Sequence, residues 1–86
     1  MLKVYAVRDV KAESYGNLIT LPAVGLALRT FEDAVNSPGS VLGQNPDDFS
    51  LYEIGTYDPI AGIISGYDVP KYITSAISHI KSKETN

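Results

Sequence analysis

The sequence predicts a small α+β domain, with a mostly antiparallel sheet of three or four strands and one main amphipathic helix packed on one face. Three observations predict this class. Residues 2–10 are rich in β-branched and aromatic residues, residues 22–36 carry a helical apolar stripe, and residues 49–64 have the pattern of two strands joined by a turn. Because 86 residues suffice for one core only, we expect a single domain over 1–86, with a frayed tail at 81–86.

The first segment, LKVYAVRDV, carries apolar side chains on both of its faces. A strand of this kind is typical of the centre of a sheet, or of a strand covered on both sides. Tyr15-Gly16-Asn17 then predicts a turn, and the following LIT a short extended piece.

The segment from Pro22 to Asn36 is the clearest helix. Thr20 is placed to cap its first amide groups, and Pro22 falls in its first turn, where a missing N–H costs little. The apolar stripe consists of Val24, Leu28, Phe31 and Val35. Asn36, Pro38 and Gly39 predict its end.

A loop over 40–48 leads into the strand FSLYEIGTY, and Asp58-Pro59 starts a turn toward a returning strand that contains IIS. This pattern predicts a β-hairpin. Asp47, Asp48 and Asp58 lie at its bends, where they either accept backbone hydrogen bonds or collect a divalent cation. No regular ligand spacing supports a metal cage, so turn capping is favoured.

The tail DVPKYITSAISHIKSKETN offers a second amphipathic helix. Asp68 would be its N-cap and Pro70 would lie in its first turn. The apolar side over 69–80 would be formed by Val69, Ile73, Ala76, Ile77 and Ile80.

The inventory of reactive side chains argues against an enzyme. The sequence has no cysteine and one histidine, His79, which we expect at the surface. Ser78 and His79 are adjacent, and neighbours on a helix point in different directions. GIISG lacks the lysine of a phosphate-binding loop. We expect no catalytic residue, no cofactor and no metal.

The chain has no apolar run near the roughly 20 residues that span a bilayer, and its N-terminus has no signal-peptide pattern. We therefore expect a cytosolic protein without membrane contact. A core of this size gives modest stability, so pairing with a second copy would help, and we expect a homodimer or a higher oligomer.

The net charge of −3, from seven basic and ten acidic side chains, argues against a strongly basic nucleic-acid coat but allows a local basic patch. Tyrosine rings stack on unpaired bases while cations follow the phosphates. The candidate nucleic-acid-binding residues are Lys3, Tyr5, Arg8, Lys11, Tyr15 and Arg29. The alternative is that the strand tyrosines close a small core with their hydroxyls at the surface.

One family resemblance covers roughly residues 3 to 75. The segments VRDV, KAESYG and LALRTFEDAVNSPGSVLGQNPDDFSLYEIGTYDPIAGII resemble the small nonstructural proteins of the Microviridae, especially of gokushovirus-type phages. The positions that match are Arg29, Phe31, Asn36, Pro38, Ser40, Pro46, Asp48, Phe49, Leu51, Ile54, Gly55, Asp58 and Gly62. The C-terminus departs most from the family pattern.

The resemblance implies a bacteriophage protein that is made in the host bacterial cytoplasm and is absent from the mature capsid. It also implies DNA binding, or help in the change from duplex replication to single-strand synthesis and packaging. It brings no motif for binding residues. We therefore expect a noncatalytic accessory protein that binds single-stranded DNA.

The alternative is a protein–protein adaptor that engages viral replication or scaffold proteins, or a host replication factor. The net negative charge favours it. A tyrosine-rich hairpin would also offer such a partner an edge strand.

Overall fold

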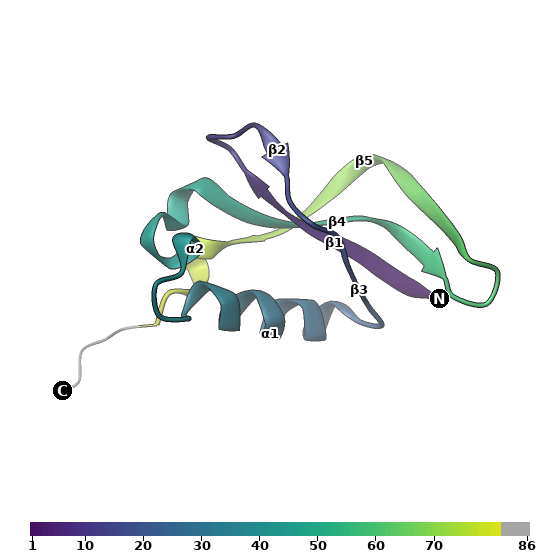
Figure 1. The fold of residues 1–86 in the computed structure, drawn as a ribbon, viewed down its shortest axis with the longest axis horizontal. Helices are drawn as coiled ribbons and strands as arrows, with labels where there is room; N and C mark the ends of the chain where they lie inside the picture. Colours follow the sequence, from purple (N-terminus) through teal and green to yellow (C-terminus); the bar gives the residue numbers. More distant parts are fainter. Residues whose placement is uncertain (82–86) are drawn as a thin grey trace.

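The computed structural model describes residues 1–81, which form a curled antiparallel sheet with one main helix beneath it (Figure 1). The strands are β1 (Leu2–Asp9), β2 (Ser14–Tyr15), β3 (Ile19–Leu21), β4 (Phe49–Asp58) and β5 (Ile63–Ser75). The helices are α1 (Val24–Val35) and α2 (Val41–Gln44), with 3-10 turns at Pro46–Asp48 and Ala76–His79. The α+β class and the main helix are thus confirmed; two of the five strands have only two and three residues.

The strand predicted over 2–10 is β1, and it lies inside the sheet. The order is β2-β1-β4-β5, with β3 also paired to β1. One edge of β1 pairs with β4 from Leu2↔Tyr57 to Asp9↔Phe49, while its other edge pairs with β2 and β3. Apolar side chains on both faces of β1 fit this central place.

The reversal after β1 lies earlier than predicted. Residues 10–13 form the turn, and Tyr15 belongs to β2. Two features of the turn explain the shift. The Asp9 carboxylate accepts hydrogen bonds from the amides of Lys11 and Ala12, and Glu13 adopts a φ of 57°. The turn predicted at Tyr15-Gly16-Asn17 is therefore wrong, whereas the extended piece after it is present as β3.

Helix α1 covers one face of the sheet (Figure 1). The buried core consists of Tyr5, Ala27, Phe31, Val35, Phe49, Leu51 and Ala76. Phe31 and Val35 were predicted to face the core, but Val24 is exposed and Ala27 takes the place next to them. The predicted cap was also wrong, because Thr20 lies in β3 and Ala23 is the N-cap, without a side-chain hydrogen bond.

The hairpin of β4 and β5 is confirmed, and Asp58 caps its turn. The Asp58 carboxylate accepts hydrogen bonds from the amides of Ile60 and Ala61, at 3.0 and 3.2 Å. The register of the pairing shifts in two places. Leu51 faces Thr74 while Tyr52 faces Tyr72, and further along Glu53 faces Lys71 while Gly55 faces Gly66. Residues 67–70 therefore bulge out of β5 opposite Ile54.

The second helix predicted after Asp68 is wrong over most of its length. Residues 69–75 continue β5, and only Ala76–His79 form a 3-10 turn. The register explains this, because Tyr72 pairs with Tyr52 and Thr74 with Leu51, so cross-strand contacts decide the backbone conformation. The predicted fray over 81–86 falls, apart from Lys81, outside the described residues.

The loop predicted over 40–48 contains two short helical pieces, α2 and the 3-10 turn at Pro46–Asp48. The Ser40 hydroxyl caps α2 by accepting from the amides of Leu42 and Gly43. Among the helices of residues 1–81, none has both the length and the apolar character that crossing a bilayer requires.

Candidate nucleic-acid interface

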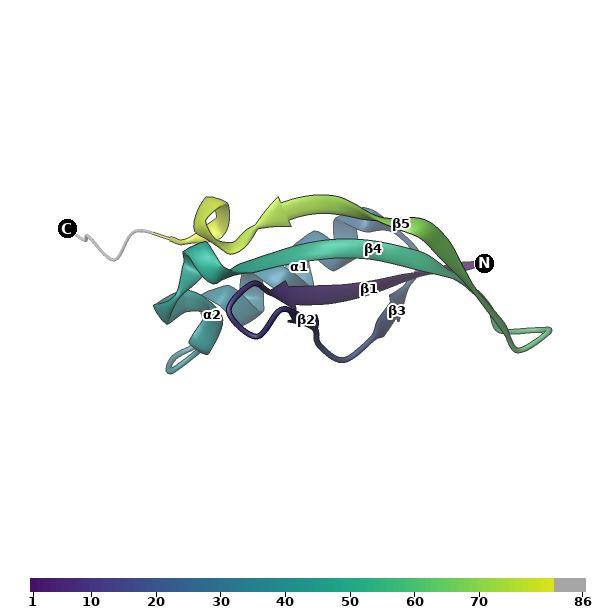
Figure 2. The same cartoon turned by 90° about the horizontal axis from the view of Figure 1, so that it is seen from above.

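A row of three tyrosines crosses the sheet on the face opposite α1. The ring centroids of Tyr15 and Tyr52 lie 5.4 Å apart and those of Tyr52 and Tyr72 lie 5.7 Å apart, both edge to face. We call this row the tyrosine ladder. Within residues 1–81, no helix packs against this face, as Figure 2 shows with α1 behind the sheet.

Strand register builds the tyrosine ladder. Tyr15 on β2 pairs with Arg8 of β1, and Tyr52 on β4 pairs with both Ala6 of β1 and Tyr72 of β5. Because successive side chains of a strand alternate between faces, Leu51 and Glu53 point toward α1 while Tyr52 points away. The ladder is thus a consequence of pairing four strands in this register.

Polar groups border both ends of the tyrosine ladder. The Arg8 guanidinium lies 5.7 Å from the centroid of the Tyr15 ring, a cation–π distance. At the other end, the Tyr72 hydroxyl shares a hydrogen bond of 2.7 Å with the Ser75 hydroxyl, which also meets the Ser50 hydroxyl at 3.2 Å. The surface therefore combines aromatic rings, one guanidinium and hydroxyl groups.

Of the six residues predicted from the sequence, the structure brings Arg8 and Tyr15 together. Lys11 lies in the exposed turn of the same β1–β2 hairpin. Arg29 is exposed on α1, which belongs to the other layer of the molecule. The predicted cations therefore do not all converge on one patch.

Tyr5 cannot stack on a base in this conformation, which corrects its predicted role. Its side chain is 0% exposed, in the core between the sheet and α1. Its hydroxyl has no hydrogen-bond partner among the described residues. For this one tyrosine, the structure supports the alternative in which a strand tyrosine closes the core, although its hydroxyl is buried rather than at the surface.

Lys3 lies on the α1 side of the sheet and is engaged by a buried carboxylate. Its Nζ is 3.4 Å from Oε2 of Glu53, which is only 4% exposed and also accepts a hydrogen bond from the Tyr67 hydroxyl. That hydrogen bond raises the pKa of Tyr67, with smaller contributions from burial and from the charge of Glu53. Burial raises the pKa of Tyr5, and the nearby Glu53 charge adds to it.

The sequence patterns did not select Tyr52 and Tyr72 as site residues. Tyr52 occupies an outward-facing position in a strand whose residues alternate between the buried and the exposed face. Its neighbours on that face depend on the register with β1, which the sequence does not give. Tyr72 lies in the segment that the sequence predicts to be helical, so the pattern gives no indication of its position on the edge strand β5. The signal was present in the alternation Leu51-Tyr52-Glu53 and in the run Tyr72-Ile73-Thr74, both typical of strands.

His79 is a structural residue rather than a surface one. Its Nε2 lies 2.9 Å from the Thr74 hydroxyl, its Nδ1 lies 3.7 Å from Glu32, and its ring packs edge to face on Phe31. These contacts fasten the 3-10 turn to α1. Within residues 1–81, no three side chains of the metal-ligating types gather in one place.

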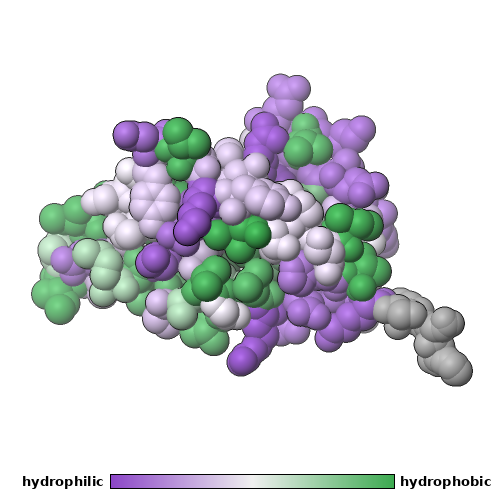
Figure 3. Space-filling view, turned by 180° about the vertical axis from the view of Figure 1, so that it is seen from behind, coloured by the Kyte–Doolittle hydropathy of each residue, from purple (hydrophilic) through white to green (hydrophobic). Residues whose placement is uncertain are grey.

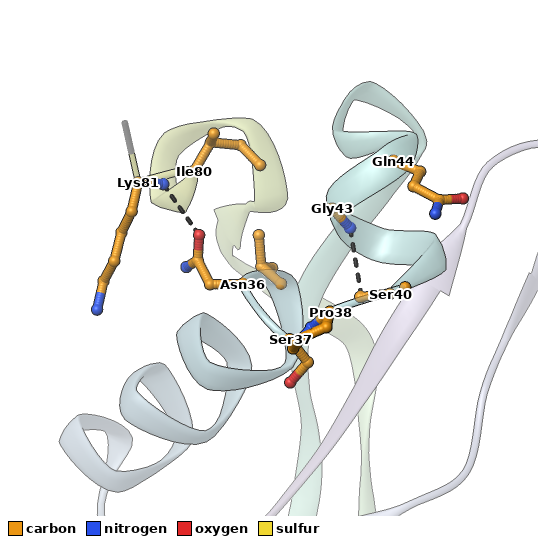
Figure 4. Close-up of a pocket in the computed structure, with 10 residues that line it drawn as sticks. Asn36, Ser37, Pro38, Ser40, Gly43, Gln44, Ile80 and Lys81 are labelled. Carbon is orange, nitrogen blue, oxygen red and sulfur yellow. Dashed lines mark hydrogen bonds between the residues drawn. The ribbon is translucent and has the colours of Figure 1, made fainter. Parts of the chain in front are cut away.

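A separate cavity of about 360 Å³ lies away from the tyrosine ladder, between the end of α1, α2 and the last described residues (Figure 4). The Asn36 side chain organises it. Its amide nitrogen donates to the carbonyl oxygens of Glu32 and His79, and its oxygen accepts from the Lys81 amide at 2.9 Å. We call this cavity the end pocket.

This geometry defines a small α+β protein with an aromatic sheet face. The model of the phage ORF5 protein family matches residues 2–79, so the chain belongs to that family. Protein ORF5 of Chlamydia phage 1 is 39% identical over 62 residues, which are 67% of this chain and 65% of that protein. Because that phage is a gokushovirus of the Microviridae, the resemblance noted from the sequence is confirmed.

A second curated protein matches over a shorter stretch. The pyridinium-3,5-bisthiocarboxylic acid mononucleotide nickel insertion protein of a Nocardioides species is 41% identical over 46 residues, or 50% of this chain. The match spans 12% of that protein, so its activity is not carried over to this chain. No solved structure matches.

Proposed function

We propose that this phage ORF5 protein is a noncatalytic accessory protein that binds single-stranded DNA through the tyrosine ladder. The binding would act during viral genome replication, or in the switch to single-strand synthesis and packaging, in the host cytoplasm. The observation that supports it is the row Tyr15–Tyr52–Tyr72 on an open sheet face with Arg8 at its end.

The chemistry of the ladder suits unpaired bases. Each base has a π-face, so stacking on a tyrosine tolerates any sequence and contributes roughly 1–3 kcal/mol per base. A duplex hides these faces inside its own stack, so an aromatic surface of this kind favours single strands. Arg8 and the exposed Lys11 lie on the same hairpin, where they would meet phosphates.

The acidic balance of the chain predicts modest affinity. With a net charge of −3 and few cations near the ladder, few phosphates would be neutralised. Stacking would therefore supply most of the binding energy, and the dependence on salt would be shallow but measurable, at about −0.7 log units per phosphate contact.

Fluorescence anisotropy with a labelled oligothymidine tests the proposal. Tyr72 is 54% exposed on an edge strand, so Tyr72→Ala should leave the fold intact and weaken binding roughly 5- to 150-fold. Tyr57→Ala is the matched control, because Tyr57 lies on β4 outside the ladder and should leave the affinity unchanged.

A second pair of variants tests the role of the cation. Arg8→Ala should weaken binding and flatten the salt dependence, while Arg29→Ala, on the helix layer, should do neither. Absence of binding at low salt, or equal effects of Tyr72→Ala and Tyr57→Ala, would overturn the proposal.

The alternative function is a protein–protein adaptor for viral replication or scaffold proteins, or for a host replication factor. The specific observation in its favour is the exposed apolar end of the β4–β5 hairpin, which includes Ile60 and Ile64. Strand addition on β5 is less suited, because the bulge at 67–70 and Pro70, which lacks an N–H, interrupt this edge. Cross-linking in infected cells, with Ile60→Asp as the comparison, tests whether such a partner is captured through this end.

A further inference from the structure

The β4–β5 hairpin ends in an apolar tip that nothing in residues 1–81 covers. Ile60 is 97% exposed, and Ile63 and Ile64 are 58% and 60% exposed. We call the segment from Asp58 to Ile64 the hairpin tip. Figure 3 shows hydrophobic side chains gathered at this projecting end of the molecule. Clustered isoleucines of this kind mark a contact surface, since water solvates them poorly.

The end pocket lies at the opposite end of the molecule. The described chain measures 50 × 26 × 18 Å, and the hairpin and α2 occupy the two ends of its long axis (Figure 1). The apolar part of the pocket is formed by Val35, Pro38, Gly43 and Ile80. The pocket is thus a concave, partly apolar surface, whereas the hairpin tip is convex and apolar.

The two surfaces also complement each other in charge. Asp58 is the only formally charged residue of the hairpin tip, and among residues 1–81 Lys81 is the only charged residue that lines the end pocket. The Lys81 side chain is 65% exposed, and its partner within the chain, Glu32, lies 3.7 Å away. An incoming carboxylate would therefore meet an accessible ammonium group.

We propose that the hairpin tip of one copy docks in the end pocket of a second copy, head to tail. The two surfaces differ and lie at opposite ends, so the contact is heterologous and leaves a free tip and a free pocket on every pair. Association through such a contact produces an open linear assembly, unless the rotation between successive copies closes the assembly into a ring.

A symmetric pairing fits the same surfaces less well. Two hairpin tips brought together would place Asp58 against Asp58, and two end pockets would enclose a void rather than fill one. Docking a tip in a pocket buries the isoleucines and joins opposite charges.

The head-to-tail contact has a consequence for the ladder, and this consequence alone rests on the proposed function. Each copy in the head-to-tail assembly would have the same orientation relative to its neighbour, so the tyrosine ladders would repeat at a fixed spacing. Neighbouring copies on one DNA strand would then support each other, which is cooperative binding.

Sedimentation velocity without nucleic acid tests the contact itself. The wild-type protein should show an average mass that rises with concentration, beyond a dimer. Ile60→Asp places a carboxylate in the apolar hairpin tip, and Ile80→Asp places one in the apolar part of the end pocket. Each variant should be monomeric on its own. An equimolar mixture of the two should form dimers and nothing larger, because one intact tip and one intact pocket remain per pair.

The controls separate this result from misfolding and from other modes of association. Val69→Asp, at an exposed residue of the β5 bulge outside both surfaces, should associate like the wild type. Lys81→Glu is a second pocket variant and should weaken association without an apolar change. Circular dichroism should show the same fold for all variants.

Three outcomes would overturn the inference. They are a wild-type protein that stays monomeric, a single variant that still associates, and a mixture that stays monomeric. A failure of DNA binding with intact head-to-tail association would instead reject the proposed function and leave the contact standing.

Discussion

The phenol of Tyr67 donates a hydrogen bond of 2.5 Å to Oε2 of Glu53, and this contact ties the bulge of β5 to the middle of β4. Glu53 is 4% exposed, and its carboxylate contacts both this donor and the Lys3 Nζ, which lies 3.4 Å away. A buried carboxylate that loses a donor keeps its desolvation cost, so this contact stabilises the hairpin more than a surface contact would.

Tyr67→Phe should lower the free energy of unfolding by about 1–2 kcal/mol, because a hydrogen bond to a charged group is removed while Glu53 stays buried. Urea denaturation measures the change. Tyr57→Phe is the control, because the Tyr57 phenol lies on the same hairpin and makes no such hydrogen bond. Equal midpoints for the two variants would contradict the assigned role of the contact.

Alkaline pH should destabilise the protein through the two tyrosines with raised pKa values. Both pKa values lie above the usual 10.0 in the folded chain, so above that pH the unfolded chain loses phenolic protons first. Stability from these groups is complete below pH 10 and is lost as pH rises through the folded pKa values. Unfolding free energies between about pH 8 and 11 should fall more steeply for the wild type than for a Tyr5→Phe/Tyr67→Phe variant. Parallel curves would reject this linkage.

Tyr5→Phe should leave stability unchanged or raise it by about 1 kcal/mol, because the substitution removes a buried hydroxyl that lacks a partner. The same variant should bind oligothymidine with the wild-type affinity, since the ring is in the core. Thermal unfolding and anisotropy check the two expectations. A marked loss of DNA affinity in a stably folded Tyr5→Phe protein would restore Tyr5 to the interface.

Gly55→Ala should destabilise the hairpin by more than about 2 kcal/mol, because an added Cβ would lie 2.3 Å from the carbonyl oxygen of Ser65. Gly25→Ala is the matched control. An added Cβ there meets nothing within 4 Å, and alanine favours a helix, so stability should rise by about 0.5–1 kcal/mol. The two substitutions add the same methyl group, so a common sign would refute the close packing of β4 on β5.

The sequence predicted those elements whose pattern is local. The apolar period around Phe31 and Val35 identified α1, and Asp58-Pro59 identified the turn of the hairpin. The prediction of a helix over residues 69–80 was wrong, because Val69, Ile73 and Ile80 have a spacing that also suits a helix. Pairing with β4 decides between a helix and a strand here, and the spacing of apolar residues along the sequence gives no information about that pairing.

The candidate site was predicted only in part for the same reason. Arg8 and Tyr15 are close in sequence and meet across a short hairpin. Tyr52 and Tyr72 join them through a register set by distant residues. Tyr5, with the same side chain and strand type, turned inward because β1 alternates and α1 covers that face.

The central position of β1 determines when this protein can fold. Its main neighbour, β4, begins at Phe49, so during synthesis β1 waits until residues 49–58 have left the ribosome before the two strands can pair. Contacts this distant along the chain slow folding. Each new chain would therefore pass through an interval in which β1 has only β2 and β3 beside it, and in that interval chaperones and proteases have access to it.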